Sequence, residues 1–273
     1  MTYRLVVADI DGTLTTSAQR ISRRVRRAVQ GAQRQGVRVC LATGRTWHSG
    51  RRYFDALGAD APAILYNGGL VYDFKRDRVL FRRPMTHRQA AGVIDILDGF
   101  PGLAAHFYVD DRIFVRWRTR LVEANARHDH IAPRAVGDFR PLLVGQPMKF
   151  RVLGPRLRLH ALARRIGRSG LAGTLVFSER ESLEVLPPGI SKGKALRRMA
   201  RHLRVSLREV IAVGNELNDL EMIQAAGLGV AMGNSPPGVR RAADLVAPSN
   251  DEDGLAEVIE RHVLTNEHAR GRI

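Results

Sequence analysis

The stretch LVVADIDGT, residues 5–13, is a short continuous apolar run that ends abruptly in two aspartates and a glycine. Two further stretches have the same form: VRVCLATGR at 37–45 and EVIAVGNELND at 209–219. Continuous Val, Leu and Ile runs of this length are typical of strands that are buried on both faces of a parallel sheet. Ligands of such sheets bind beyond the carboxyl ends of the strands. We therefore expect all three polar turns at one edge of a single sheet.

The segment between the first two runs predicts a helix. Ile21, Val25 and Val29 recur at the i, i+4, i+8 spacing of an apolar helix stripe, and Gly36 is a suitable terminator. The resulting β-α-β order implies a right-handed crossover. The sequence thus predicts an α/β protein whose core is a Rossmann-like parallel sheet.

The middle of the chain has a different pattern. Helix-like segments at 86–98 and 155–168 alternate with strand patterns, and Asp110 and Asp111 mark the turn of a hairpin. We interpret this region as an α/β cap domain inserted into the core, after which the parallel-sheet pattern resumes. The expected domains are a first core segment at 1–82, a cap domain at 83–186 and a second core segment at 187–273.

The expected cap hairpin carries His106, Tyr108 and Arg112. We interpret these side chains as an ordinary half-exposed sheet face, and contact with the leaving group of a substrate is the alternative. The cap itself is expected to close over a substrate, to exclude water and to set specificity.

Charge and composition limit the class of partner. Basic residues outnumber acidic ones by 44 to 27, which gives a net charge of +17, yet they are spread over expected helices. Aromatic residues make up only 6%, so there is no obvious stacking platform for single-stranded nucleic acid. We interpret the basic residues as solvated faces that could steer anions, and we expect no nucleic-acid partner. A single cysteine, Cys40, and the lack of a signal peptide or long apolar run predict a cytoplasmic protein without a membrane partner.

Asp9 and Asp11 are separated by one residue at the end of the first expected strand, so both carboxylates can face the same side. Two carboxylates this close repel each other unless a cation lies between them, and oxygen ligands with room for water suit magnesium. One carboxylate could attack phosphorus, while the other protonates the leaving alcohol and then activates water. Aspartate and glycine also fill ordinary turns, which is the alternative interpretation.

Two further segments offer groups that suit a phosphate, and a third offers more oxygen ligands. The hydroxyl and amides of TGR at 43–45 are suitable phosphate ligands at a strand end. Lys192 falls in the first turn of a helix that Ser191 is expected to cap, so its charge adds to the helix dipole. GNELND at 214–219 supplies oxygen ligands at the third strand end. Only four of the 44 basic residues are lysine and two of them lie in SKGK, which makes Lys192 a candidate for a role that guanidinium fills badly.

These motifs in this order resemble those of the haloacid dehalogenase superfamily of phosphohydrolases, and specifically its Cof-type sugar-phosphate phosphatases. DIDGTL, ATGR, SKGKAL and GNELNDLEM are similar to the four motifs of that superfamily. YNGGLVYD, GVAMGNSPPGVRRAAD and SNDEDG also resemble the subfamily, so the similarity covers the whole chain and is loosest in the cap. The resemblance implies a Mg²⁺-dependent phosphatase that acts on small phosphorylated metabolites.

The resemblance also implies roles for individual residues. Asp9 would be the nucleophile and a metal ligand, and Asp11 the acid and base, with its backbone carbonyl on the metal. Asp219 would support the metal ligands and Lys192. The implied set comprises catalytic residues Asp9, Asp11, Thr43 and Lys192, phosphate-binding residues Ile10, Gly12, Thr43, Gly44, Lys192 and Asn218, and metal-binding residues Asp9, Asp11, Asn215 and Asp219.

One position departs from the family pattern. The fourth motif usually reads Gly-Asp, and this chain has Gly214-Asn215. Asparagine offers a neutral carbonyl where the family offers a carboxylate, so we expect an active enzyme with weaker magnesium affinity. The alternative is a decayed site that binds without turnover.

Two other functions stay open at the level of the sequence. A sugar phosphomutase would share the same core. A catalytically impaired protein of this fold could instead bind nucleic acid or phosphorylated ligands through its basic surface. The sequence contains no motif that names the physiological substrate or the oligomeric state.

Overall fold

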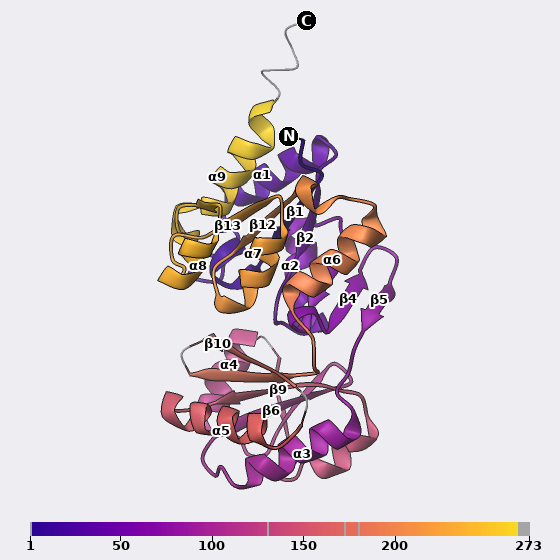
Figure 1. Ribbon diagram of the computed structural model, residues 1–273, viewed down its shortest axis with the longest axis vertical. Coiled ribbons are helices and arrows are strands. Elements are labelled where there is room, and N and C mark those ends of the chain that lie inside the picture. Colours follow the sequence, from indigo (N-terminus) through magenta and orange to yellow (C-terminus); the bar gives the residue numbers. More distant parts are fainter. Residues whose placement is uncertain (1, 130, 172, 180, 267–273) are drawn as a thin grey trace, which may run out of the picture. The chain divides into compact units, whose positions relative to one another are not determined.

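The computed structural model describes residues 2–129, 131–171, 173–179 and 181–266 (Figure 1). The chain forms two compact units, each with its own sheet. The first unit consists of Met1–Gly44, Gly50–Phe81 and Ser191–Ile273, and the second of Arg45–Ser49 and Arg82–Ile190.

The first unit is built on a five-stranded parallel sheet in the order β14-β13-β12-β1-β2. Strand β1, between β12 and β2, is buried along its whole length because strands flank both its edges and helices cover both faces of the sheet. This arrangement confirms the predicted α/β class with a parallel-sheet core. The strands are β1 Leu5–Ala8, β2 Arg38–Leu41, β12 Val210–Gly214, β13 Leu228–Ala231 and β14 Leu245–Val246.

Helices pack on both faces of this sheet. The helices α6 and α7 bury apolar side chains against alternate residues of β1 and β12, including Leu5, Val7 and Ala212. The helices α1 and α9 contact each other on the opposite face. Ser22 caps α1, and Gly36, with φ of 77°, follows that helix as predicted. The helices of this part of the chain are α1 Arg23–Arg34, α2 Trp47–Leu57, α6 Lys192–Leu203, α7 Leu220–Ala225, α8 Pro237–Ala242 and α9 Gly254–His262.

A second, three-stranded sheet adjoins the end of β2. It consists of β3 Ala63–Leu65, β4 Leu70–Asp73 and β5 Arg78–Arg82, and a parallel bridge joins Ala42 to Ile64. Between β3 and β4 the chain turns sharply, with positive φ at Tyr66, Asn67 and Gly68 in succession. The sequence patterns did not predict this sheet.

The register of the parallel sheet brings the predicted polar turns together. Ala8, the last residue of β1, pairs with Leu41 of β2 on one side and with Val213 of β12 on the other. The three strands therefore end at the same level, and the residues that follow them share one edge. The expectation of a single polar edge is confirmed.

The second unit has a six-stranded sheet in the order β10-β11-β9-β6-β7-β8. One face is covered by α3 His87–Asp98 and α5 Arg156–Arg168, and Phe107 and Phe150 stack in its core with ring centroids 4.2 Å apart. The remaining elements are β6 Ala104–Val109, β7 Arg112–Val115, α4 Arg120–Asp129, β8 Arg134–Ala135, β9 Pro147–Leu153, β10 Thr174–Glu179 and β11 Ser182–Leu186.

The β6–β7 hairpin turns at Asp110 and Asp111, which both have positive φ. The expectation of a half-exposed face on this hairpin was wrong for two of its side chains. His106 and Tyr108 are 1% and 2% exposed, and of the three residues only Arg112 is exposed. Lys149 of the neighbouring strand extends over the ring of Tyr108, with Nζ 4.8 Å from the centroid.

Candidate active site

The first carboxylate of the site follows directly from the end of β1. The Asp9 N–H donates to Val213 O of β12 at 3.0 Å, which extends the sheet by one bond, and the residue is 5% exposed. Residues Ile10–Leu14 then form a wide turn in which Gly12 has φ of 74°. A Cβ atom at Gly12 would lie 2.6 Å from Asn215 Nδ2. Glycine is required here both for the backbone conformation and for the close approach to Asn215.

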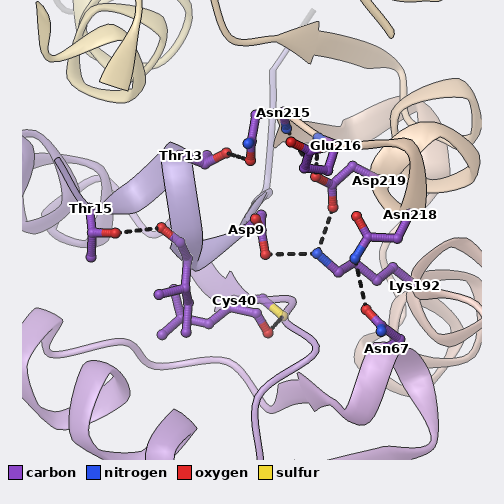
Figure 2. Close-up of polar contacts among 12 residues, drawn as sticks. Asp9, Thr13, Thr15, Cys40, Asn67, Lys192, Asn215, Glu216, Asn218 and Asp219 are labelled. Carbon is purple, nitrogen blue, oxygen red and sulfur yellow. Dashed lines mark hydrogen bonds and ion pairs between the residues drawn. The ribbon is translucent and has the colours of Figure 1, made fainter. Parts of the chain in front are cut away.

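Lys192 joins two carboxylates in the interior of the first unit (Figure 2). Its Nζ lies 2.7 Å from Asp9 Oδ1 and 2.6 Å from Asp219 Oδ1, and the side chain is 1% exposed. Lys192 is the first residue of α6. As predicted, Ser191 caps this helix, and its side-chain oxygen accepts a hydrogen bond from Lys194 N–H. A buried charge is tolerated only when it is paired, and here one ammonium is shared by two carboxylates.

Burial, together with an excess of negative charge, perturbs the titration of the cluster. Burial raises the pKa of the Asp9 carboxyl to about 7; Lys192 opposes this rise, while Asp219 and Asp11 add to it. Burial disfavours the charged form of Lys192, but Asp219 and Asp9 outweigh burial and raise the pKa of the ammonium. A carboxylate nucleophile must be ionised, so a cation near Asp9 would favour its reactive form.

Asp219 organises the loop that follows β12. Its Oδ2 accepts from the N–H groups of Asn215 at 2.9 Å and Glu216 at 3.0 Å, while its Oδ1 accepts from Lys192. A Cβ atom at Gly214 would lie 2.5 Å from Asp219 Cβ, so the loop folds back closely on itself. With both oxygens engaged, Asp219 holds the loop and the lysine in place.

The donor set beside Asp9 fits a magnesium ion. The terminal side-chain atom of Asn215 that faces the loop lies 2.8 Å from Asp11 O, 3.2 Å from Asp9 Oδ2 and 2.9 Å from Thr13 Oγ1. Oxygen ligands at about 2.1 Å from an octahedral Mg²⁺ lie roughly 3 Å from one another. An amide oxygen at this position therefore lies at the spacing of neighbouring ligands from one carboxylate oxygen and from one main-chain carbonyl, and all three are oxygens of the kind that suits Mg²⁺.

Acidic side chains alone do not make this set. Within the part of the chain that the structure describes, no group of three or more His, Cys, Asp or Glu residues is placed to hold a metal. Two of the three oxygens belong to the Asn215 amide and the Asp11 main chain, which are not acidic side chains. With asparagine in place of aspartate at position 215, the site keeps an oxygen there but carries one negative charge fewer.

The segment after β2 contributes a further part of the site. Thr43 is 1% exposed, its N–H donates to Ile64 O at 2.8 Å, and its carbonyl accepts from Asn67 N–H at 3.0 Å. A Cβ atom at Gly44 would lie 3.2 Å from Asn67 Nδ2. Asn218 Nδ2 donates to Asn67 Oδ1 at 2.9 Å (Figure 2). Asn67 thus connects the segment after β2 with the segment after β12.

The structure brings the predicted site residues together from four segments of the chain. Asp9, Lys192 and Asp219 are in direct contact, Asn215 adjoins Asp9 and the Asp11 carbonyl, and Asn218 reaches Thr43 and Gly44 through Asn67. Ile10 and Gly12 lie in the turn that carries Asp11.

Two residues of the site were not predicted from the sequence. Asn67 is 2% exposed with φ of 55°, a conformation that asparagine adopts more readily than most residues. Thr13 is 2% exposed and contacts the Asn215 side chain. The available signals were the Asn-Gly-Gly turn of YNGGLVYD for Asn67 and the threonine of DIDGTL for Thr13.

Comparison with known proteins identifies the family. A family model described as haloacid dehalogenase-like hydrolase matches residues 6–259. The chain belongs to this family. The predicted resemblance to Cof-type members of the haloacid dehalogenase superfamily is confirmed, and so is the prediction of an enzyme.

Relatives of this haloacid dehalogenase-like hydrolase match it along nearly its full length. Phosphatase YwpJ of Bacillus subtilis (strain 168) is 30% identical, with 96% of this chain and 100% of YwpJ covered. Pyridoxal phosphate phosphatase YbhA of Escherichia coli (strain K12) is 28% identical, with 97% and 100% covered. The crystal structure of a haloacid dehalogenase-like hydrolase from Bacteroides thetaiotaomicron has a TM-score of 0.86 at 31% identity and covers 95% of this chain and 99% of its own. No helix in the described ranges of this hydrolase has the length and apolar character that crossing a membrane would need.

Proposed function

We propose that this chain is a magnesium-dependent phosphomonoester hydrolase that acts on small phosphorylated metabolites through an aspartyl-phosphate at Asp9. The observation that carries the proposal is the buried contact of Lys192 with Asp9 and Asp219, beside an Asn215 amide that lies at ligand spacing from Asp9 Oδ2 and from the Asp11 carbonyl. Membership of the haloacid dehalogenase-like hydrolases and the phosphatases among its relatives support it.

In the first step a carboxylate oxygen of Asp9 attacks the phosphorus of a phosphomonoester. A bond forms between that oxygen and phosphorus, the bond from phosphorus to the leaving oxygen breaks, and the electron pair leaves with the alcohol. Asp11 donates a proton to the leaving oxygen. In the second step the Asp11 carboxylate takes a proton from water, which attacks phosphorus and releases phosphate and the Asp9 carboxylate.

Fixed charges and donors hold the transferring group during both steps. Lys192 offers its ammonium beside Asp9, at the N-terminal end of α6 where the helix dipole also favours an anion. We assign further phosphate contacts to Thr43 and Gly44 after β2 and to Asn218, whose amide is held by Asn67. Ile10 and Gly12 in the turn after Asp9 complete the proposed phosphate-binding set.

The residues that would hold Mg²⁺ are Asp9, Asp11 through its carbonyl, and Asn215, with Asp219 supporting the loop and the lysine. When bound, the ion would neutralise charge on the phosphoryl group and keep Asp9 ionised. Because Asn215 contributes no charge, this chain's site should bind the ion more weakly than a site with a third carboxylate at that position.

We also propose that residues 83–186 act as a cap domain that sets specificity, while residues 1–82 and 187–273 form the catalytic core. The separate sheet and apolar core of the second unit support this division. Sugar phosphates and pyridoxal phosphate are the substrates to test first, the latter because of the relative YbhA. A cytoplasmic location stays a prediction.

Hydrolysis of a panel of metabolite phosphates and of p-nitrophenyl phosphate, with and without Mg²⁺, tests the proposal. We expect phosphate release that needs Mg²⁺ and that is abolished in Asp9→Asn, whereas Asp251→Asn, which alters an exposed carboxylate bonded to Ser17, retains the rate. Isomerised sugar phosphate without free phosphate would indicate a phosphomutase. Salt-sensitive binding of nucleic acid with no turnover of any substrate would indicate the impaired binding protein.

A further inference from the structure

Two of the groups that the Asn215 amide faces accept hydrogen bonds and do not donate them. Its loop-facing atom lies 3.2 Å from Asp9 Oδ2 and 2.8 Å from Asp11 O. An ionised carboxylate and a main-chain carbonyl are acceptors only, so without a cation they favour a donor over a third acceptor at this position. The amide nitrogen, turned toward them, donates to both; the amide oxygen, turned the same way, would repel both.

The third neighbour of this atom accommodates either orientation. Thr13 Oγ1 lies 2.9 Å away, and a hydroxyl donates to an amide oxygen or accepts from an amide nitrogen by rotating its own hydrogen. The choice between the two orientations is therefore left to Asp9 and Asp11. In the absence of a cation they favour nitrogen, and a cation bound by both of them favours oxygen.

The surroundings fix the position of the Asn215 side chain but not the direction of its amide. Its main-chain N–H is anchored to Asp219 Oδ2 at 2.9 Å, the residue is 6% exposed, and Gly12 packs closely against it. The nitrogen and oxygen of an amide have nearly the same size, so a half-turn exchanges them without displacing a neighbour. Aspartate at this position would have no donor to turn toward Asp9.

We infer that the Asn215 amide takes the place of the cation when the enzyme is free of metal, and that its nitrogen then donates to Asp9 and to the Asp11 carbonyl. When Mg²⁺ binds, the amide rotates by a half-turn and presents its oxygen. The inference rests on the magnesium site of the proposed function but not on turnover of any substrate. The nitrogen-in orientation keeps the loop assembled without metal, and Mg²⁺ must displace two hydrogen bonds in order to bind. Asn215 is thus a positioning residue that stabilises the metal-free site and weakens the metal-bound one.

Stability measurements on the whole chain at pH 8 test the metal-free half of the inference. In EDTA, urea unfolding of Asn215→Asp should show a folding equilibrium constant ~10-fold or more below that of the wild type, because Asp9 and the Asp11 carbonyl lose a donor and face a new charge. Excess Mg²⁺ should remove or reverse this difference, since the added carboxylate then has a cation to bind. Equal stability of the two proteins in EDTA would overturn the inference.

Asn250→Asp is the matched control. Asn250 is 8% exposed and its Nδ2 donates to the Thr15 carbonyl at 2.9 Å, so the change likewise removes a buried donor from a main-chain acceptor. Its destabilisation should be the same in EDTA and in Mg²⁺. Equal recovery of both variants by Mg²⁺ would overturn the inference, because recovery would then not depend on the position beside Asp9.

The side-chain amide resonance of Asn215 in a ¹⁵N–¹H spectrum reports the half-turn of the amide directly. The resonance is assigned by its loss in Asn215→Asp. We expect this resonance to shift on addition of Mg²⁺ at the concentration at which calorimetry detects binding. Binding with no change at this amide would overturn the inference and leave the proposed function standing. If Mg²⁺ does not bind at all, both the proposed half-turn of the Asn215 amide and the proposed magnesium dependence are wrong. Activity that persists in EDTA would count against the proposed function alone.

Discussion

Lys192 Nζ lies 2.7 Å from Asp9 Oδ1, a buried contact between residues 183 positions apart in the chain. The same ammonium contacts Asp219, so a single side chain of α6 connects the end of β1 with the loop after β12. This contact makes the lysine part of the structure as well as of the proposed chemistry, and the two contributions can be separated by experiment.

Lys192→Ala should lower both the rate and the stability. Two buried carboxylates lose their counter-ion, which we expect to cost about 3–5 kcal/mol of unfolding free energy, and the phosphoryl group loses a fixed charge, which we expect to lower kcat by about 100-fold or more. Urea unfolding and steady-state kinetics measure the two effects. Lys194→Ala, an exposed lysine of the same helix, should change neither. A kcat for Lys192→Ala within threefold of the wild type would refute the assigned role.

The pH dependence of stability in EDTA should reveal the perturbed Asp9 carboxyl. Its pKa is raised from 3.8 to about 7, so the folded protein binds this proton more tightly than the unfolded chain does. The resulting stabilisation is complete below pH 3.8 and is lost as the pH rises through about 7. We expect the wild type to lose stability relative to Asp9→Asn between pH 5 and pH 8, by on the order of 1–4 kcal/mol. A constant difference across that range, or a gain by the wild type, would contradict the assignment.

Asn215→Asp should lower the magnesium concentration that gives the half-maximal rate. The change restores a carboxylate at a position where the chain offers a neutral oxygen, and affinity for divalent ions increases with ligand charge. We expect a decrease of about tenfold or more in magnesium titrations of the initial rate. Asn250→Asp, which adds the same charge to another buried loop position, provides the comparison. An unchanged magnesium requirement in Asn215→Asp would rule out this explanation of the substitution.

Gly12→Ala and Gly36→Ala form a matched pair, since the two glycines have φ of 74° and 77°. A Cβ atom at Gly36 meets nothing within 4 Å, so this change costs only the backbone strain of about 1–2 kcal/mol. A Cβ atom at Gly12 would in addition press on the Asn215 amide. We expect Gly12→Ala to lose more stability and most of its activity, and Gly36→Ala to keep its kcat. If the two variants lose the same stability and the same activity, the close approach of Gly12 to Asn215 is not important for function.

The sequence could predict those parts of the fold and site that depend on local pattern. Asp9, Thr43 and Asn215 each follow a continuous apolar run, and such runs pair in parallel with their carboxyl ends at one edge. Ser191 could be predicted as a cap because its hydroxyl acts on an N–H three residues away. The residues of the candidate site could be named in this way, while their catalytic roles remain predictions.

What could not be predicted depends on contacts between distant segments. Asn67 lies in a turn whose sequence indicates only its conformation, and its position between Gly44 and Asn218 follows from the packing of the smaller sheet. Strand alternation predicts which side His106 and Tyr108 face, but not how much of that side is covered. The contact of Thr13 with Asn215 likewise joins residues 202 positions apart.

The nucleophilic role of Asp9 can be tested most directly by determining a crystal structure of the enzyme with Mg²⁺ and beryllium fluoride. We predict that beryllium is bonded to a carboxylate oxygen of Asp9, with Lys192 and Thr43 in contact with the fluorides. An active enzyme whose crystals carry the beryllium adduct on another side chain, or none at Asp9, would contradict the mechanism.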